Sequence, residues 1–281
     1  MDIKCWGARG SAPVSGREFT RYGGHTSCLG VSAGNPAQAV MLDFGSGALP
    51  LGHTLLEYNI FEIDVFVTHS HWDHIMGFPL FPLIFQPEAS INFYYNPRYQ
   101  GHPEKLICQS LMKPPHFPVR YEDLPCSINF IQTDTTFNFG PFKASTIPLS
   151  HPNAGLGCRL EYQGKSLVFL TDNELGLKNK PGRTYEEYVH FCHQADLLIH
   201  DAEYHTIKEY QAARGFGHSL ASDVIRLAHD AQVQSLAFFH HNRNRTDRQL
   251  DDSLRRLQKE FSHLIRFHFF AFAEGQTVSL N

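Results

Sequence analysis

The stretch Thr68-His69-Ser70-His71-Trp72-Asp73-His74 decides how this sequence is interpreted, and it directly follows the apolar run Val65-Phe66-Val67. The side chains of His69, His71, Asp73 and His74 can all bind metal, and they lie within six residues. Without a partner, such a cluster costs free energy when buried, and its imidazoles repel one another when charged. A divalent metal ion removes both costs, so the stretch predicts a metal site in preference to a solvated polar loop.

The spacing of these residues bears on how many ions they hold. In an extended segment residues two apart face the same side, so His69 and His71 can reach one ion. If the chain turns into a helix near Asp73, the change of periodicity directs Asp73 and His74 toward a second ion. The motif therefore predicts a two-metal site of the kind found in hydrolases.

Length and composition narrow the class of protein. A chain of 281 residues can form one hydrolase domain over 1–281, and its formal charge of -4 favours a small substrate over a long nucleic acid. Its six cysteines form no CxxC pair and are expected to be reduced core residues. With neither a signal peptide nor 18 consecutive apolar residues, we expect a cytoplasmic protein with no membrane partner. A homodimer is compatible with the sequence.

Short apolar runs alternate with two amphipathic helical patterns, at 219–231 and 248–261, which indicates a layered α/β fold. Five of the predicted strands are each followed by a candidate ligand. Such residues converge where the carboxyl ends of strands meet. The strands are predicted at 3–6, 28–32, 40–44, 64–68, 91–95, 142–147, 158–162, 166–171, 196–199, 235–239, 267–272 and 277–280, and the five ligand positions are His69, His151, Asp172, His200 with Asp201, and His240.

These residues make the chain resemble the metallo-β-lactamase-fold hydrolases, in the branch that contains ribonuclease Z and small phosphodiesterases. The resemblance covers nearly the whole chain and implies an αββα sandwich, with two mixed β-sheets flanked by helices and metals at one edge. After 69–74, it is carried in family order by Leu149-Ser150-His151, Phe169-Leu170-Thr171-Asp172, His200-Asp201-Ala202, Gly217-His218-Ser219 and Phe238-Phe239-His240-His241.

The resemblance also implies a ligand set. One ion is assigned to His69, His71 and His151, the other to Asp73, His74 and His240, and Asp172 bridges them. Zn suits these donors best, although Mn and Fe also accept imidazole and carboxylate. His241 is an alternative to His240, which is preferred as the first residue past its strand. Asp43 resembles the family aspartate that orients a ligand imidazole, or it is a plain strand-end turn.

The activity implied is attack by a metal-bridging hydroxide on a small phosphodiester such as a cyclic nucleotide. His218 is expected to donate a proton to the leaving oxygen, with Asp201 holding its ring, and Asp73 joins them in the catalytic set. The alternative reading makes His218 only the neighbour of a helix N-cap at Ser219.

Three other functions stay open. The first is a tRNA 3′-end endonuclease like ribonuclease Z. Against this function, the interval from Asp172 to Asp201 is too short for the long Gly/Pro-rich arm with which that family often binds tRNA. In this interval Lys178, Lys180 and Arg183 form only a short basic stretch. The others are hydrolysis of a lactone, thioester or β-lactam, and metal binding without catalysis. An insertion rich in Pro and aromatic residues, at about 81–125, is either a lid or base-stacking wall or an outer elaboration.

Overall fold

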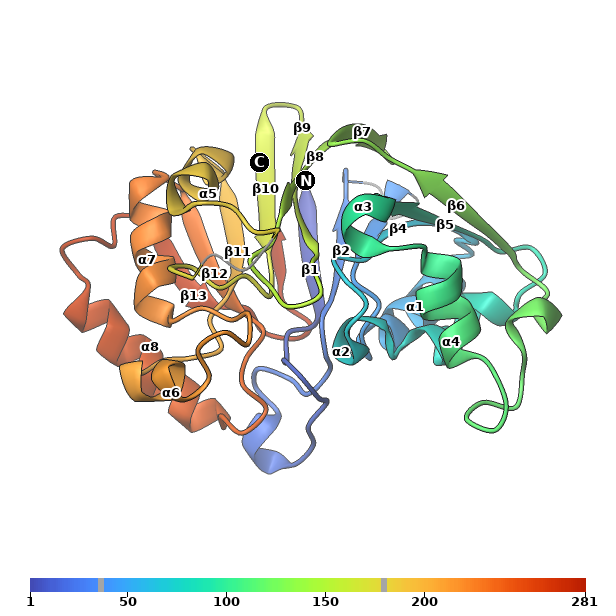
Figure 1. Ribbon diagram of the computed structural model, residues 1–281, viewed down its shortest axis with the longest axis horizontal. Coiled ribbons are helices and arrows are strands. Elements are labelled where there is room, and N and C mark those ends of the chain that lie inside the picture. The colour runs from blue at the N-terminus through green and yellow to red at the C-terminus, as the bar shows by residue number, and fades with distance from the viewer. Residues whose placement is uncertain (35–37, 178–180) are drawn as a thin grey trace.

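The computed structural model describes residues 1–34, 38–177 and 181–281. Two seven-stranded β-sheets pack face to face, and helices cover the outer face of each sheet (Figure 1). This architecture confirms the predicted α/β class and αββα layering. No helix in the described part of the chain is long and apolar enough to cross a lipid bilayer.

The first sheet contains the N-terminal half of the chain and the last strand. Strands β3 to β6 run parallel to their neighbours, whereas β14, β1, β2 and β3 pair antiparallel. The order across the sheet is β14 (Thr277–Ser279), β1 (Asp2–Gly7), β2 (Cys28–Ser32), β3 (Val40–Leu42), β4 (Glu62–Phe66), β5 (Ser90–Tyr95) and β6 (Ser127–Gln132).

The second sheet is also mixed. Strands β10 to β13 are parallel, and β7 to β10 pair antiparallel. The order is β13 (His268–Ala271), β12 (Ser235–Phe239), β11 (Leu197–Asp201), β10 (Lys165–Leu170), β9 (Leu156–Tyr162), β8 (Phe142–Pro148) and β7 (Thr136–Phe139). Because β8, β10, β11 and β12 run the same way, the residues that follow them meet at one edge.

Helices α1 (Ala48–Glu57), α3 (Pro97–Gln100) and α4 (Gln109–Leu111) lie on the side of the first sheet (Figure 1). On the side of the second sheet are α5 (Tyr185–Cys192), α6 (Ile207–Ala212), α7 (Ala221–Asp230) and α8 (Asp247–Glu260), and α2 (Trp72–Ile75) lies near the middle. Shorter turns are η1 (Arg17–Phe19), η3 (Phe78–Leu80), η4 (Pro82–Phe85), the π-helical η5 (Glu104–Cys108) and η6 (Tyr121–Asp123).

Alternation along β10 shows how the layers are held together. Leu167 and Phe169 belong to the core between the sheets, whereas Val168 and Leu170 pack with Val224 and Leu227 of α7. Each such buried side chain stabilises the fold by about 1.5–3 kcal/mol relative to exposure. The apolar side chains of β10 are therefore buried on both faces of the strand. This burial fixes the position of Asp172, which follows the strand.

Several local expectations were wrong or incomplete. Strands β6 and β7 were not predicted, and the helix predicted from Ser219 begins at Ala221 instead. Its N-cap is Leu220, whose apolar side chain cannot cap the helix, and the Ser219 hydroxyl donates instead to the Asn173 carbonyl at 2.5 Å. The segment 81–125 contributes β5, which pairs with strands on both sides. The six cysteines are free, as expected, and only Cys126 is not fully buried.

Candidate metal centre

The motif at 69–74 lies where an extended segment becomes a helix. Strand β4 ends at Phe66, and His71, the N-cap of α2, has extended backbone with φ -66° and ψ 152°. Helix α2 then begins at Trp72, so Asp73 and His74 are buried, whereas Trp72 is 62% exposed. The change of periodicity expected near Asp73 is thus present.

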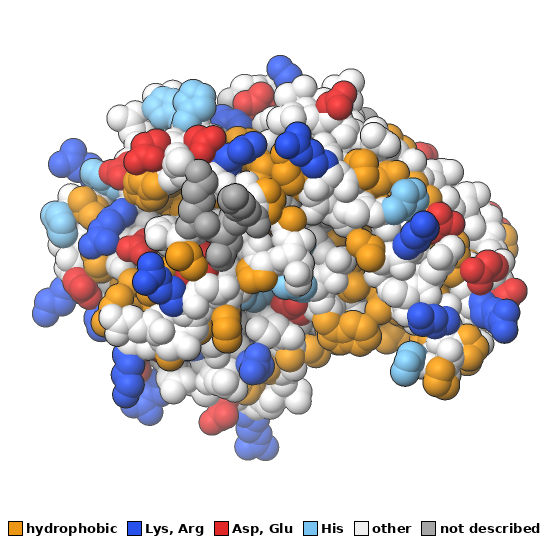
Figure 2. Space-filling view, viewed as in Figure 1, with side chains coloured by type: hydrophobic (Ala, Val, Ile, Leu, Met, Phe, Trp, Pro, Cys, Tyr) orange, Lys and Arg blue, Asp and Glu red, His pale blue; other side chains and the backbone are white. Residues whose placement is uncertain are grey.

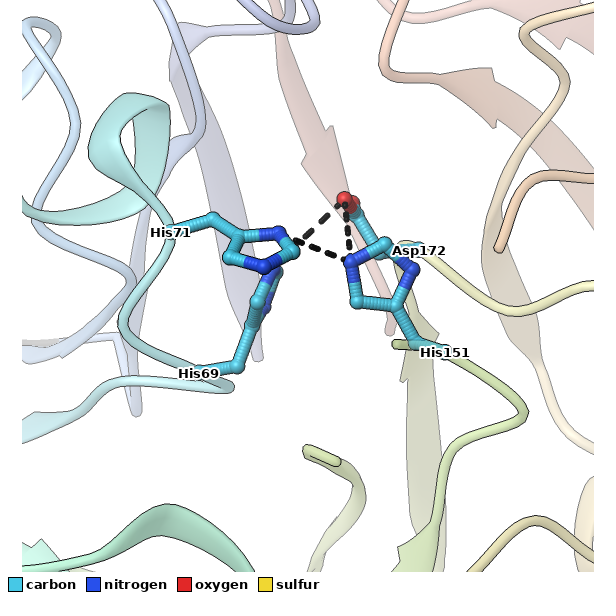
Figure 3. A group of neighbouring side chains, drawn as sticks. All are labelled: His69, His71, His151 and Asp172. Atoms are coloured by element: carbon cyan, nitrogen blue, oxygen red, sulfur yellow. Dashed lines mark hydrogen bonds and ion pairs between the residues drawn. The ribbon is translucent and has the colours of Figure 1, made fainter. Parts of the chain in front are cut away.

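The first group of candidate ligands joins the two sheets. His69 and His71 follow β4, and His151 and Asp172 follow β8 and β10 of the second sheet. Their ligand atoms lie within 4.8 Å of one another, and His151 Nε2 is 2.9 Å from His71 Nδ1. Figure 3 shows the four side chains pointing toward one another from opposite sides.

The second group consists of Asp73, His74 and His240, again within 4.8 Å. Asp73 Oδ2 lies 3.0 Å from His240 Nε2 and 3.4 Å from His74 Nε2. The rings of His74 and His240 are nearly parallel, with centroids 5.5 Å apart. All three side chains are buried.

Asp172 lies between the two groups and offers one oxygen to each. Its Oδ2 is 3.7 Å from Nε2 of both His69 and His151, whereas its Oδ1 is 3.3 Å from His74 Nε2 and 3.4 Å from His240 Nε2. Asp172 has φ +54°, in the left-handed region, at the turn that follows β10. The structure therefore brings all seven predicted ligands together around one shared carboxylate.

The donor set fits divalent metal on two grounds. Among the described residues, the buried Nε2 atoms of His69 and His74 have no hydrogen-bond partner, although each faces a carboxylate. A buried ring nitrogen without a partner is costly, and a metal ion would satisfy it. Imidazole and carboxylate are also the donors that Zn, Mn and Fe accept.

The charge balance also favours a cation. Burial lowers the pKa of His69, His71 and His151, to about 4 for His151, which keeps them in the neutral form that binds metal. Burial opposes charge on His74 and His240 too, but Asp172 and Asp73 outweigh it and raise the pKa of both rings. Despite burial, those two rings hold the carboxyl pKa values of Asp73 and Asp172 well below their usual range. The site thus attracts positive charge even without metal.

Two buried carboxylates orient the candidate ligand rings from behind. Asp43 Oδ2 is 2.7 Å from His74 Nδ1, and its Oδ1 accepts from the Thr68 N–H and hydroxyl at 2.8 Å each. Asp43 thus contacts a candidate ligand imidazole, and it is also a strand-end turn residue, with φ +62°. Glu203 Oε2, which was not predicted, lies 3.2 Å from His240 Nδ1. Its only sequence signal is its position two residues after Asp201.

His218 lies beside both groups and is 12% exposed. Its Nδ1 is 3.5 Å from Asp201 Oδ2 and 3.9 Å from Asp172 Oδ2, and its ring stacks on His240 with centroids 4.8 Å apart. Burial opposes charge on His218, but Asp172 and Asp201 outweigh it and raise its pKa. The arrangement suits a ring that carries a proton next to the candidate metal positions.

Some candidates lie away from the centre. His241 Nε2 is 2.8 Å from the Phe272 carbonyl, and His200 Nδ1 is 2.8 Å from the Asp201 carbonyl. Arg9 is buried against Asp247, whereas Ser11 donates a backbone N–H to Asp73 Oδ2 at 2.7 Å. Lys178 and Lys180 lie outside the described residues.

The centre reaches the surface in a hollow between the two halves of the molecule. Figure 2 shows histidine and acidic side chains in this hollow, with hydrophobic side chains gathered beside them. His71 is partly exposed there, and Asn153 Nδ2 lies 3.2 Å from its Nε2. The first ligand group is therefore not fully enclosed by protein.

Comparison with known proteins gives consistent results. The model of the beta-lactamase superfamily domain matches residues 48–241. The chain is 24% identical to ribonuclease Z of Thermoplasma acidophilum over 247 residues, 71% of this chain and 76% of that protein. It is 25% identical to ribonuclease Z of Halalkalibacterium halodurans over 250 residues, 73% and 78% of the two chains.

Solved structures share the fold over the whole chain. The metallo-beta-lactamase fold protein YhfI from Bacillus subtilis superposes with a TM-score of 0.72 at 17% identity, covering 99% of this chain and 98% of that one. The short form of human tRNase Z superposes with a TM-score of 0.67 at 18% sequence identity, and the match covers 100% of both chains. A diphosphatase of the PhnP family superposes with a TM-score of 0.70 at 15% sequence identity, and the match covers 100% of this chain and 98% of that one. The chain therefore belongs to the beta-lactamase superfamily, as a metallo-β-lactamase-fold hydrolase similar to ribonuclease Z.

Proposed function

We propose that this protein is a binuclear metal-dependent phosphodiesterase that hydrolyses a small phosphodiester, such as a cyclic nucleotide. The observation that carries the proposal is the pair of ligand groups that share Asp172, with His218 beside them. Phosphodiester hydrolysis needs charge stabilisation on phosphate oxygens and a proton for the leaving oxygen. This arrangement offers both.

The two ions are assigned as the sequence predicts, and Zn²⁺ suits the sites best. His69, His71 and His151 would hold one ion, Asp73, His74 and His240 would hold the other, and Asp172 would serve both. Bound divalent ions supply Lewis acidity, which lowers the pKa of water and neutralises phosphate charge.

The chain's own groups complete the chemistry. His218 delivers a proton to the leaving oxygen, and Asp201, 3.5 Å from its Nδ1, holds the ring and favours its charged form. Asp43 and Glu203 keep Nδ1 of His74 and His240 engaged, which leaves Nε2 of each ring available to a metal ion.

One further observation favours a substrate that carries a base. Trp72 lies between His71 and Asp73 and is 62% exposed. An indole this exposed, adjacent in sequence to two candidate ligands, offers a face on which a nucleobase can stack, and such stacking stabilises binding by about 1–3 kcal/mol per base. This supports a nucleotide in preference to an aliphatic diester.

The second candidate is tRNA 3′-end processing. It is supported by the ribonuclease Z relatives, whose matches cover 63% to 85% of this chain. Against it, the described residues between Asp172 and Asp201 form only turns, the helix α5 and most of β11, and the formal charge is -4. A long RNA gains most of its affinity from basic contacts to phosphate, so we rank it second.

A single substrate panel separates these functions. The Zn²⁺-loaded protein is assayed with bis(p-nitrophenyl) phosphate, cyclic nucleotides, precursor tRNA, a lactone and a β-lactam. We expect cleavage of the first two. Turnover of the lactone without phosphodiester cleavage would overturn the proposal, and cleavage of precursor tRNA alone would establish the second candidate.

A further inference from the structure

Glu174 is a buried carboxylate that lies two residues after Asp172 and has no part in the proposed chemistry so far. It is 1% exposed, and none of the lysine and arginine ion pairs among the described residues includes it. Instead it accepts backbone hydrogen bonds from Gly215, at 2.9 and 3.1 Å, and from Gly217, at 2.9 Å. Such charge-assisted bonds are strong, so Glu174 fixes this turn.

The turn that Glu174 holds is the one that delivers His218. Gly215 and Gly217 have φ of +94° and +91°, and a Cβ on Gly217 would lie 1.9 Å from His151 Nδ1. The Gly217 carbonyl is 3.1 Å from the same nitrogen. The turn is therefore pressed against a candidate ligand ring, where no side chain fits.

The backbone on the other side of His218 is held by a second buried carboxylate. Ser219 N–H donates to Asp201 Oδ2 at 2.9 Å. The residue before His218 is thus bound to Glu174 and the residue after it to Asp201. By contrast, His218 Nδ1 is 3.5 Å from Asp201 Oδ2, longer than an ordinary N–H···O bond. The backbone on either side of His218 therefore helps to place the ring, together with Asp201.

We propose that Glu174 is a positioning residue that places His218 for proton transfer to the leaving oxygen. The inference rests on the proposed function, because it assumes that His218 is the proton donor. Glu174→Gln keeps the shape but replaces one acceptor oxygen with an NH₂ group, which then faces a backbone N–H. The turn loses at least one bond, and His218 shifts relative to the substrate. Misplacement of a reacting group by about 1 Å can cost about 100-fold in rate.

The test uses two diesters that differ only in the leaving group, methyl p-nitrophenyl phosphate and methyl phenyl phosphate, with the Zn²⁺-loaded protein. Nitrophenolate leaves without a proton, whereas phenol, with a pKa of about 10 like tyrosine, needs one. We expect Glu174→Gln to lower kcat for the phenyl ester about tenfold more than for the nitrophenyl ester. KM and the content of about two ions per chain should stay the same. A purely structural role would lower both rates equally or release metal.

Glu209→Gln is the matched control. Glu209 also accepts two backbone N–H bonds, from His205 at 2.8 Å and Thr206 at 2.9 Å, but at the start of α6. It should leave the ratio of the two rates unchanged. If Glu174→Gln does not fold, Glu174→Asp keeps the charge and displaces it by one methylene, and the same selective loss, of smaller size, is expected.

The outcomes separate the two claims. If His218→Ala shows the selective loss on the phenyl ester and neither Glu174 variant does, the positioning role is wrong and the proposed function stands. If His218→Ala lowers both rates equally, the proton-donor role is itself wrong, and the inference falls with it.

Discussion

Replacing Asp43 with Asn tests whether the carboxylate behind His74 controls metal binding. Asp43 Oδ2 lies 2.7 Å from His74 Nδ1 and 2.6 Å from the Ser27 hydroxyl. Asn keeps Oδ1, which accepts from Thr68, but places an NH₂ group against His74. Nδ1 must then accept, and the ring proton moves to Nε2, the atom assigned to the metal.

The size of the effect follows from this single contact. Loss of such an orienting partner typically weakens metal binding about 10- to 100-fold, which is about 1.4–2.7 kcal/mol. Because His74 belongs to only one ligand group, we expect one of the two Zn²⁺ affinities to fall and the other to change little. Folding should be nearly unaffected, since three of the four hydrogen bonds of Asp43 can be kept by rotating the Ser27 hydroxyl.

The assay is titration of the apoprotein with Zn²⁺ against a competing chelator, with metal content measured after desalting. Asp64→Asn is the control, because Asp64 lies on β4 and accepts from Asn92 at 2.9 Å instead of contacting a ligand ring. If Asp43→Asn binds both Zn²⁺ ions with the affinities of the wild type, Asp43 does not control metal binding through His74.

Four further predictions follow from the same geometry. Asp172→Asn should reduce bound metal from about two ions to one or fewer and lower kcat/KM by about 10³-fold, since its two oxygens serve separate groups; two retained ions with full activity would contradict this. Glu203→Gln should weaken Zn²⁺ binding at the His240 group about tenfold in the same titration, and an unchanged affinity would count against its orienting role. Gly10→Ala should lower the free energy of unfolding by about 1–3 kcal/mol in urea, because a Cβ there lies 2.2 Å from His240 Nδ1; equal stability would show that the ring moves freely. Removing metal with a chelator should lower Tm relative to protein in free Zn²⁺ at 1,000 times Kd, where bound metal adds about 4 kcal/mol per site, and an identical Tm would mean that no metal binds.

The candidate centre could be predicted from the sequence wherever ligands are local or follow apolar strands. His69 to His74 are contiguous, and His151, Asp172 and His240 each come shortly after a buried strand. Both signals follow from periodicity, which a single sequence carries. Their meeting at one place was expected because the strands run the same way, and the structure brings all seven residues together.

What escaped prediction depends on contacts between distant residues. Glu203 and Glu174 act on atoms 37 and 41 or more positions away, and no local pattern marks those contacts. Serine is a common N-cap residue, but the Ser219 hydroxyl donates to the Asn173 carbonyl and its N–H donates to Asp201. These tertiary hydrogen bonds replace the helix cap that the local sequence predicts. Strands β6 and β7 lie at sheet edges with half-exposed side chains, which weakens the apolar signal.

Each ligand group draws its members from both sheets. His69, His71, Asp73 and His74 follow a strand of the first sheet, whereas the other three candidates follow strands of the second. An ion in either position would act as a cross-link between the layers, much as a disulfide joins distant parts of a chain. Metal affinity and the docking of one layer on the other are then a single equilibrium. A molecule whose layers have not closed would hold neither ion, so we expect an incompletely folded chain to lack hydrolytic activity.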